Sequence, residues 1–243
     1  MNQFIISTGA STGIGRAIAI EFAKSGATVA LIARSKEKLE KTKQLVEQAG
    51  GKAEVFVTDL SKIENINQLI TKIKSKTNQI NALINVAGIW HGKNTVYAGT
   101  DFDTFDQQVI LDTITVGTTA PTLLSHALIS LMKKGSSIIN ISGTFESGAK
   151  GWLPYFVSKK AIEDLTIGLA DELKDKGVKV NCISPSDTAT EEYKKYFPQY
   201  IKDAISPQEI AEYAVYLASN KFEDTGKVFV MKKDKKPYEG YHT

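Results

Sequence analysis

The sequence predicts an α/β protein: a doubly wound parallel sheet of about seven strands, with helices on both faces, in a single domain over residues 1–243. Short apolar runs rich in Val and Ile alternate with longer amphipathic stretches along the chain. Such runs are typical of strands buried on both faces, as strands are in a parallel sheet. No linker, repeat or low-complexity block divides the sequence, and 243 residues suit one sizeable domain.

The expected elements alternate along the chain. Strands are expected at residues 4–7, 28–33, 53–57, 82–86, 137–142, 178–183 and 228–231. Helices are expected at residues 14–25, 36–49, 63–77, 104–134, 153–176 and 207–218. Glycines end several helical stretches, as Gly26 and Gly177 illustrate. Because ligands of such folds bind outside the carboxyl ends of the strands, functional residues should follow strands directly.

The composition excludes several function classes. A net charge of +3 is small and spread along the chain, so no nucleic-acid partner is expected. Lysines cluster only in the tail from about residue 231, which we interpret as a solvated end. We find no signal-like N-terminus and no apolar run long enough for a bilayer, which predicts a cytoplasmic protein without membrane contact. The single cysteine, Cys182, lies in an apolar strand and is expected to be a buried core residue in a reducing compartment. No metal site is expected.

A glycine-rich turn follows the first expected strand and opens the first helix. Gly9 allows a tight turn, Gly13 lets the backbone approach a pyrophosphate, and Gly15 permits close packing of helix on strand. Unpaired N–H groups at the helix start then face the phosphates. The position of the turn between strand and helix predicts a dinucleotide cradle of the Rossmann type.

Arg34 ends the second strand, where an NAD enzyme is expected to carry Asp or Glu for the ribose hydroxyls. A guanidinium suits a 2′-phosphate instead, so the sequence favours NADP(H) over NAD(H). The alternative is a solvated arginine that begins a helix. Arg16 lies just past the glycine turn and is expected to be a surface residue.

The spacing T-G-x-x-x-G-x-G from Thr8 to Gly15 resembles the classical short-chain dehydrogenase/reductase family. The resemblance covers roughly residues 1–230. It implies further cofactor contacts, in the glycine turn and after the third, fourth and sixth strands, where Pro185 to Thr190 resembles the family's P-G-x-[VI]-x-T. These contacts are Ser11, Thr12, Ile14, Asp59, Leu60, Asn85, Ala87, Gly88, Pro185, Thr188 and Thr190.

Tyr155 and Lys159 lie early in a long helical stretch, four residues apart. This spacing places a phenol and an ammonium on one helix face, about 5–6 Å apart at Cβ. A phenol with a pKa near 10 is a slow proton donor at neutral pH, and a nearby cation lowers that pKa. The resemblance implies that Tyr155 exchanges the proton with the substrate and that Lys159 also binds the nicotinamide ribose.

Ser142 ends the fifth strand, thirteen residues before Tyr155, and resembles the family serine that hydrogen-bonds the substrate oxygen. Relatives often read N-I-S-S and use the second serine, whereas this chain reads Asn140-Ile141-Ser142-Gly143. Of Ser142 and Gly143 only Ser142 carries a hydroxyl, so we assign to it the hydrogen bond to the substrate oxygen. The alternative is a serine that caps a turn.

Two departures from the family pattern stand out. The helix before the fifth strand lacks the usual Asn, whose position falls on Asp112, Ile114 or Gly117. The V-D-G-G-like ending that helps build family tetramers is replaced by a lysine-rich tail. The expected assembly is a homodimer or a homotetramer, with the tetramer edge in doubt.

Aromatic residues follow the fourth, fifth and sixth strands and are expected to line the substrate pocket. They predict a moderately apolar carbonyl or alcohol as the small-molecule substrate. The residues are Trp90, His91, Phe145, Trp152 and 193–197. Two functions stay open: an oxidoreductase that moves a hydride between NADP(H) and a carbonyl/alcohol pair, and an NADP-binding regulatory or scaffold protein with little turnover.

Overall fold

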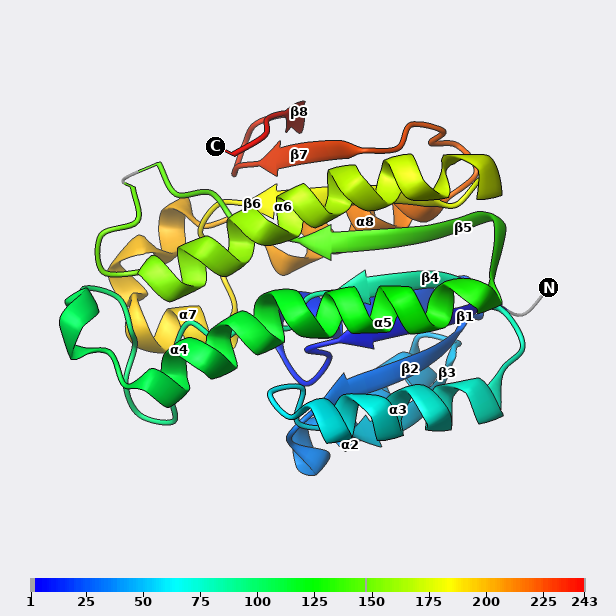
Figure 1. Ribbon diagram of the computed structural model, residues 1–243, viewed down its shortest axis with the longest axis horizontal. Helices are drawn as coiled ribbons and strands as arrows, with labels where there is room; N and C mark the ends of the chain where they lie inside the picture. Colours follow the sequence, from blue (N-terminus) through cyan, green and yellow to red (C-terminus); the bar gives the residue numbers. More distant parts are fainter. Residues whose placement is uncertain (1–2, 147, 243) are drawn as a thin grey trace.

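An eight-stranded sheet forms the centre of the molecule, in the order β3-β2-β1-β4-β5-β6-β7-β8 (Figure 1). The computed structural model describes residues 3–146 and 148–242. The strands are β1 Phe4–Thr8, β2 Thr28–Ala33, β3 Lys52–Val57, β4 Ile80–Asn85, β5 Met132–Ile141, β6 Lys179–Pro185, β7 Lys227–Met231 and β8 Tyr238–Glu239. Neighbouring strands are parallel from β3 to β7, and β8 pairs antiparallel with β7.

Helices cover both faces of the sheet. They are α1 Gly13–Ala23, α2 Lys36–Gln48, α3 Ile63–Lys76, α4 Gln107–Ile114, α5 Ala120–Leu128, α6 Leu153–Leu173, α7 Glu191–Tyr196 and α8 Pro207–Ala218. Figure 1 shows α3, α5 and α6 in front of the sheet and α8 behind it. The core accordingly forms two layers. One joins α1, α2 and α8 to the sheet, and the other joins α3, α5 and α6 to the opposite face.

Local sequence explains where these elements begin. All five residues of β1 are buried, as a central parallel strand requires. Ser206 starts α8 with a capping box: its side chain accepts an N–H of the first turn, while Glu209 accepts the backbone N–H of Ser206. Ser35 caps α2 by accepting the N–H of Lys38. The ends of α2 and α8 therefore follow from residues next to them in the chain.

The strand order creates a switch point at β1. The chain runs outward from β1 through β2 to β3 and then returns to place β4 on the other side of β1. Crossovers leave β1 and β4 in opposite directions, so a crevice opens at their carboxyl ends. The segments that follow these two strands carry the glycine turn and the predicted cofactor residues Ala87 and Gly88.

The predicted fold class is confirmed, with three differences in detail. The sheet has an eighth strand, β8, because the tail folds back on the edge of β7 in a pairing of two residues, too short to leave a sequence pattern. The helix expected at 104–134 begins only at Gln107, and β5 already starts at Met132. The short helix α7 was not predicted; it lies in the segment expected to line the pocket.

The helical stretch Gln107–Leu131 is interrupted by a π-helical turn, Thr115–Thr119, between α4 and α5. By length and composition alone this stretch of 25 residues is apolar enough to cross a bilayer, contrary to the expectation from the sequence. Its buried residues Val116, Leu124 and Leu128 pack in the core layer beside α3 and α6. It thus occupies the place of a core helix of the α/β fold.

Candidate active site

The glycine turn packs so tightly that side chains are excluded at two of its positions. A Cβ on Gly15 would lie 2.4 Å from the carbonyl oxygen of Gly9. Gly9 has a φ of 65°, and a Cβ there would lie 3.1 Å from the backbone of Ala87. The turn therefore brings the end of β1 against the loop after β4, as a close-packed cradle requires.

The start of α1 fits a phosphate. Thr12 precedes the helix, and within the described residues no side chain caps its first N–H groups. Gly13 has a φ of 54° and carries no side chain that would cover these N–H groups. A Cβ on Gly13 would lie 2.9 Å from Cγ2 of Thr190. Free N–H groups and the helix dipole favour an anion at this point. These residues can hold the pyrophosphate of a dinucleotide.

Thr8, to which the sequence analysis gave no role, joins the two strand ends that form the crevice. Its Oγ1 accepts hydrogen bonds from the N–H groups of Val86 (2.9 Å) and Ala87 (3.2 Å). The signal for it was a threonine at the last position of the strand before the glycine turn. This hydroxyl holds the segment 86–88 beside the cradle.

Arg34 and Asp59, assigned from different strands, line one pocket at the outer part of the crevice. Asp59 accepts the N–H of Ser61, which shapes the turn after β3, and Leu60 is buried. The structure thus brings the residues expected at the 2′-phosphate and the adenine to the same place. Asn85 behaves differently: its Nδ2 donates to Asn140 in the interior (2.8 Å), so its side chain does not face the cradle.

Arg16 is not the surface residue that the sequence predicted. Its side chain is 12% exposed, forms an ion pair with Glu191 (2.9 Å) and donates to the hydroxyl of Thr42 (3.1 Å) and the carbonyl of Ser11. The first contact spans 175 positions of the chain. Sequence reasoning missed this role because the partner lies on α7, across the crevice.

Tyr155 and Lys159 meet the crevice from the first turns of α6. The Lys159 Nζ lies 5.3 Å from the centroid of the Tyr155 ring and donates to the carbonyl of Ile141 (2.8 Å). A Cβ on Gly88 would lie 3.3 Å from that Nζ and 3.4 Å from Cε2 of Tyr155. The loop after β4, held by Thr8, therefore lies in contact with both members of the pair.

Burial shifts the protonation of both groups. It raises the pKa of Tyr155 and lowers the pKa of Lys159 to about 8, because a low-dielectric surrounding disfavours the charged forms. The pKa of Tyr155 was expected to lie below its ordinary value and lies above it, because desolvation of the phenol outweighs the effect of the ammonium. Lys159 remains mostly protonated at neutral pH.

The aromatic residues predicted for the pocket form one cluster beside Tyr155. Phe145 and Trp152 have ring centroids 5.9 and 6.3 Å from that of Tyr155. Phe197, just past α7, contacts both Trp152 (6.2 Å) and Trp90 (6.3 Å). Tyr193, Tyr196 and His91 complete the cluster through Phe197 and Trp90. Their expected convergence is confirmed.

The segment after β6 connects the cluster to the cradle. The hydroxyl of Thr190 accepts the N–H of Tyr193 and caps α7, and the hydroxyl of Thr188 donates to the carbonyl of Ser186 (2.9 Å). The Pro185 carbonyl accepts the N–H of Thr144, which ties the loop after β6 to the loop after β5. Within the described residues the Thr190 hydroxyl donates to no acceptor, and its methyl lies over Gly13.

Residues 3–200 match the family model for short chain dehydrogenases. The chain belongs to the short-chain dehydrogenase/reductase family. It is 32% identical over 192 residues to a 3beta-hydroxysteroid dehydrogenase of Mediterraneibacter gnavus, covering 77% of this chain and 67% of the relative. It is 33% identical over 217 residues to a fatty acyl-CoA reductase of Acinetobacter baylyi, covering 86% and 70%. A short chain dehydrogenase structure from Shigella flexneri, in complex with NADP, is similar with a TM-score of 0.82 and 29% identity, covering 95% and 97%.

In this short-chain dehydrogenase the Ser142 hydroxyl, which the sequence assigned to the substrate oxygen, is bound to a carboxylate. The Ser142 hydroxyl donates to Oε1 of Glu163 (2.7 Å), which lies two helical turns beyond Tyr155 on α6. Gly143 follows, and a Cβ there would lie 3.9 Å from the Phe145 ring, on the side of the aromatic cluster. The structure therefore brings Tyr155 and Lys159 together, and it directs the Ser142 hydroxyl elsewhere.

Glu163 is a buried carboxylate that sequence reasoning missed. Besides the Ser142 hydroxyl it accepts the backbone N–H of His242 (2.8 Å), and Lys160 lies 3.6 Å from Oε2. Its signal was its spacing, since positions 155, 159 and 163 share one helix face. His242 thus reaches the end of β5, next to Tyr155 and Lys159.

The helical stretch before β5, which holds the three candidate positions for the family's helix Asn, contacts α6 at its π-helical turn. Gly117, in the π-helical turn, packs on Ser158, whose Cβ lies 2.7 Å from where a Cβ on Gly117 would be. Asp112 instead accepts a hydrogen bond from Gln108 on its own helix. Gly117 thus contacts the residue next to Lys159 and brings no side chain there.

Proposed function

We propose that this protein is an NADP(H)-dependent oxidoreductase that transfers a hydride between the nicotinamide and a carbonyl/alcohol substrate, with Tyr155 as general acid and base. The observation that carries the proposal is the contact of Gly88 with both Tyr155 and Lys159. It puts the proton-exchanging pair next to the crevice where the glycine turn would hold the dinucleotide. Family membership supports the same reaction class.

In the reducing direction, bound NADPH supplies the hydride that the carbonyl carbon accepts. Tyr155 donates its hydroxyl proton to the carbonyl oxygen, so that hydride and proton together make the alcohol. The Lys159 ammonium stabilises the phenolate left on Tyr155. Since the pKa of Lys159 is about 8, this cation is available at neutral pH.

Arg34 supports the preference for NADP(H). Arg34 follows β2, at the position where an acidic residue would favour NAD(H). It lines one pocket together with Asp59. Replacing Arg34 with Asp should weaken NADPH binding far more than NADH binding, measured by cofactor fluorescence titration. Equal losses for the two cofactors would show that Arg34 does not bind the 2′-phosphate.

The aromatic cluster supports an apolar carbonyl or alcohol as substrate. Five rings, of Trp90, Phe145, Trp152, Tyr196 and Phe197, form a connected cluster that includes two neighbours of the Tyr155 ring. The named relatives act, by their names, on a hydroxysteroid and a fatty acyl thioester. A panel of ketones and aldehydes that ranges from small polar to large apolar compounds tests this proposal.

The decisive experiment measures NADPH oxidation over that panel for the wild type and for Tyr155→Phe. We expect turnover with apolar carbonyls, and a loss of about 10²–10⁴-fold in kcat for the variant, with NADPH binding retained. An unchanged kcat in Tyr155→Phe would remove the acid/base role.

The second candidate is an NADP-binding regulatory protein with little turnover. The observation that favours it is the bond from Ser142 to Glu163, together with Gly143 and Gly117, which leave fewer polar groups beside the pair than the family pattern implies. NADPH binding without turnover across the whole panel would select this candidate.

A further inference from the structure

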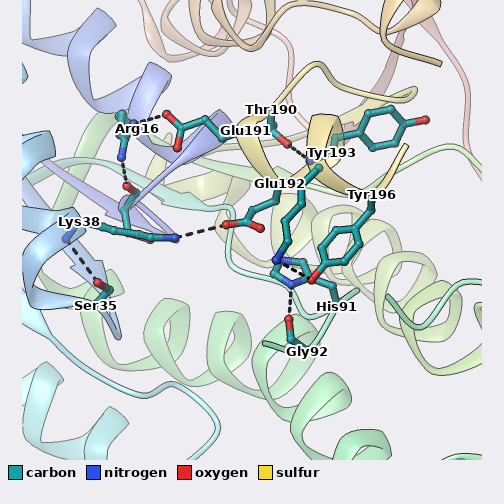
Figure 2. Close-up of polar contacts among 12 residues, drawn as sticks. Arg16, Ser35, Lys38, His91, Gly92, Thr190, Glu191, Glu192, Tyr193 and Tyr196 are labelled. Carbon is teal, nitrogen blue, oxygen red and sulfur yellow. Dashed lines mark hydrogen bonds and ion pairs between the residues drawn. The ribbon is translucent and has the colours of Figure 1, made fainter. Parts of the chain in front are cut away.

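The first turn of α7 carries two carboxylates, and each pairs with a cation across the crevice. Glu191 lies 2.9 Å from the Arg16 guanidinium of α1, and Glu192 lies 3.3 Å from the Lys38 ammonium of α2 (Figure 2). The second pair spans 154 positions of the chain. Helix α7 is therefore fastened to the half of the molecule that holds the cofactor cradle.

The two cations stand at the two places where phosphates of the proposed cofactor would lie. Arg16 follows the glycine turn directly and donates to the carbonyl of Ser11 within it. Lys38 lies in the first turn of α2, and its N–H donates to the hydroxyl of Ser35, next to Arg34 (Figure 2). Lys38 is thus a neighbour of the expected 2′-phosphate site.

The far end of α7 reaches the aromatic cluster. The Tyr196 ring lies 5.9 Å from that of Trp90, and Phe197 contacts Trp152, which lies beside Tyr155. One short helix therefore connects the cation at the cradle to the covering of the catalytic tyrosine. Release of its first turn would loosen that covering.

The two ion pairs differ in how firmly their cations are held. Arg16 is 12% exposed and has two further partners, Ser11 and Thr42. The Lys38 side chain is 49% exposed, and an exposed ion pair contributes little to stability, so its ammonium can change partners. A phosphate carries more negative charge than a carboxylate and offers more acceptor oxygens.

We propose that Lys38 is shared between Glu192 and the 2′-phosphate of NADP(H). In the free enzyme the ammonium pairs with Glu192. When the 2′-phosphate takes the ammonium, the first turn of α7 keeps the Arg16–Glu191 pair but loses this one, which loosens the turn. Lys38 is then a second residue for cofactor selection beside Arg34. The inference rests on the proposed preference for NADP(H).

The test compares binding of 2′,5′-ADP with binding of 5′-AMP, which lacks only the 2′-phosphate, by calorimetry. Glu192→Gln should tighten 2′,5′-ADP binding about three- to tenfold, because Lys38 no longer has to leave a carboxylate. It should leave 5′-AMP within twofold. In a Lys38→Gln background the same substitution should have no effect, since the effect passes through Lys38.

Two outcomes overturn the proposal. One is an equal gain in 2′,5′-ADP binding from Glu192→Gln with and without Lys38. The other is an equal gain in 2′,5′-ADP binding relative to 5′-AMP from the control Glu191→Gln, whose partner Arg16 lies at the glycine turn. Either result would reduce the effect to general repulsion. Hydrogen exchange of residues 191–197 gives a second readout: 2′,5′-ADP should speed exchange in the wild type, and Glu192→Gln should show fast exchange without ligand. If the wild type binds 2′,5′-ADP no better than 5′-AMP, the NADP preference itself fails. If the wild type prefers 2′,5′-ADP, and substitutions at positions 38 and 192 change its binding additively, the NADP preference stands. In that case only the proposed sharing of Lys38 fails.

Discussion

Two buried lysines lie at opposite ends of the sheet, and they differ in the number of hydrogen-bond acceptors around each ammonium. Lys179 starts β6 at the amino end and is 9% exposed, while Lys159 faces the carboxyl ends and is 3% exposed. Burial lowers the pKa of both. Burial and pKa direction alone therefore do not distinguish the two lysines.

Hydrogen-bond partners make the difference. The Lys179 ammonium donates to three carbonyls, those of Leu217 (3.1 Å), Ser219 (2.6 Å) and Phe222 (2.6 Å), which uses all three of its protons. Within residues 3–146 and 148–242, the Lys159 ammonium has one such acceptor, Ile141. Two of its protons remain for a ligand, and they lie beside Gly88 and Tyr155. A buried cation with incomplete protein partners indicates a binding site.

Lys159→Met gives the largest expected effect. Without the cation the phenolate on Tyr155 loses its stabilisation, and we expect kcat to fall about 10²–10⁴-fold. The free energy of unfolding should change little, because the substitution also removes the desolvation cost of a buried charge. Steady-state kinetics and urea unfolding measure the two quantities. A kcat within threefold of the wild type would indicate that Lys159, like Lys179, contributes little to turnover.

Lys179→Met should show the reverse pattern. Three carbonyls lose a charged donor at once, and we expect the free energy of unfolding to fall by about 3–5 kcal/mol. The kcat per folded molecule should stay within twofold, since Lys179 lies at the far end of the sheet. A Lys179→Met variant with the wild-type free energy of unfolding and a reduced kcat would contradict this prediction.

The smallest effect is a pH dependence of stability. The pKa of Lys159 is about 8 in the folded protein and about 10.4 in an unfolded chain, so between these values the unfolded state binds more protons. The free energy of unfolding contributed by this group should therefore rise with pH across that window, while below pH 8 the full burial cost is present. Urea unfolding at pH 7.5, 8.5 and 9.5 should show this rise in the wild type relative to Lys159→Met. Parallel pH profiles for the two proteins would argue against a depressed pKa.

The sequence by itself determined the fold class, the glycine turn and the Tyr155–Lys159 pair. Each depends on short-range geometry: strand and helix periods, φ angles that glycine allows, and the four-residue repeat of a helix face. These local features do not depend on what the helix or strand packs against, so they can be recognised in the sequence. The two residues of β8 and the short α7 fall below the length at which such periods can be recognised.

Only the tertiary structure decided which partners the polar side chains find. Ser142 has the expected place in the chain, yet its hydroxyl turns to Glu163, and Arg16 finds Glu191 on a helix 175 positions away. Such contacts depend on how loops from separate strands meet at the carboxyl edge, and no local period encodes that meeting. The carboxyl ends of the strands are therefore predictable from sequence. The hydrogen bonds between the side chains that follow those ends depend on how the sheet and helices pack.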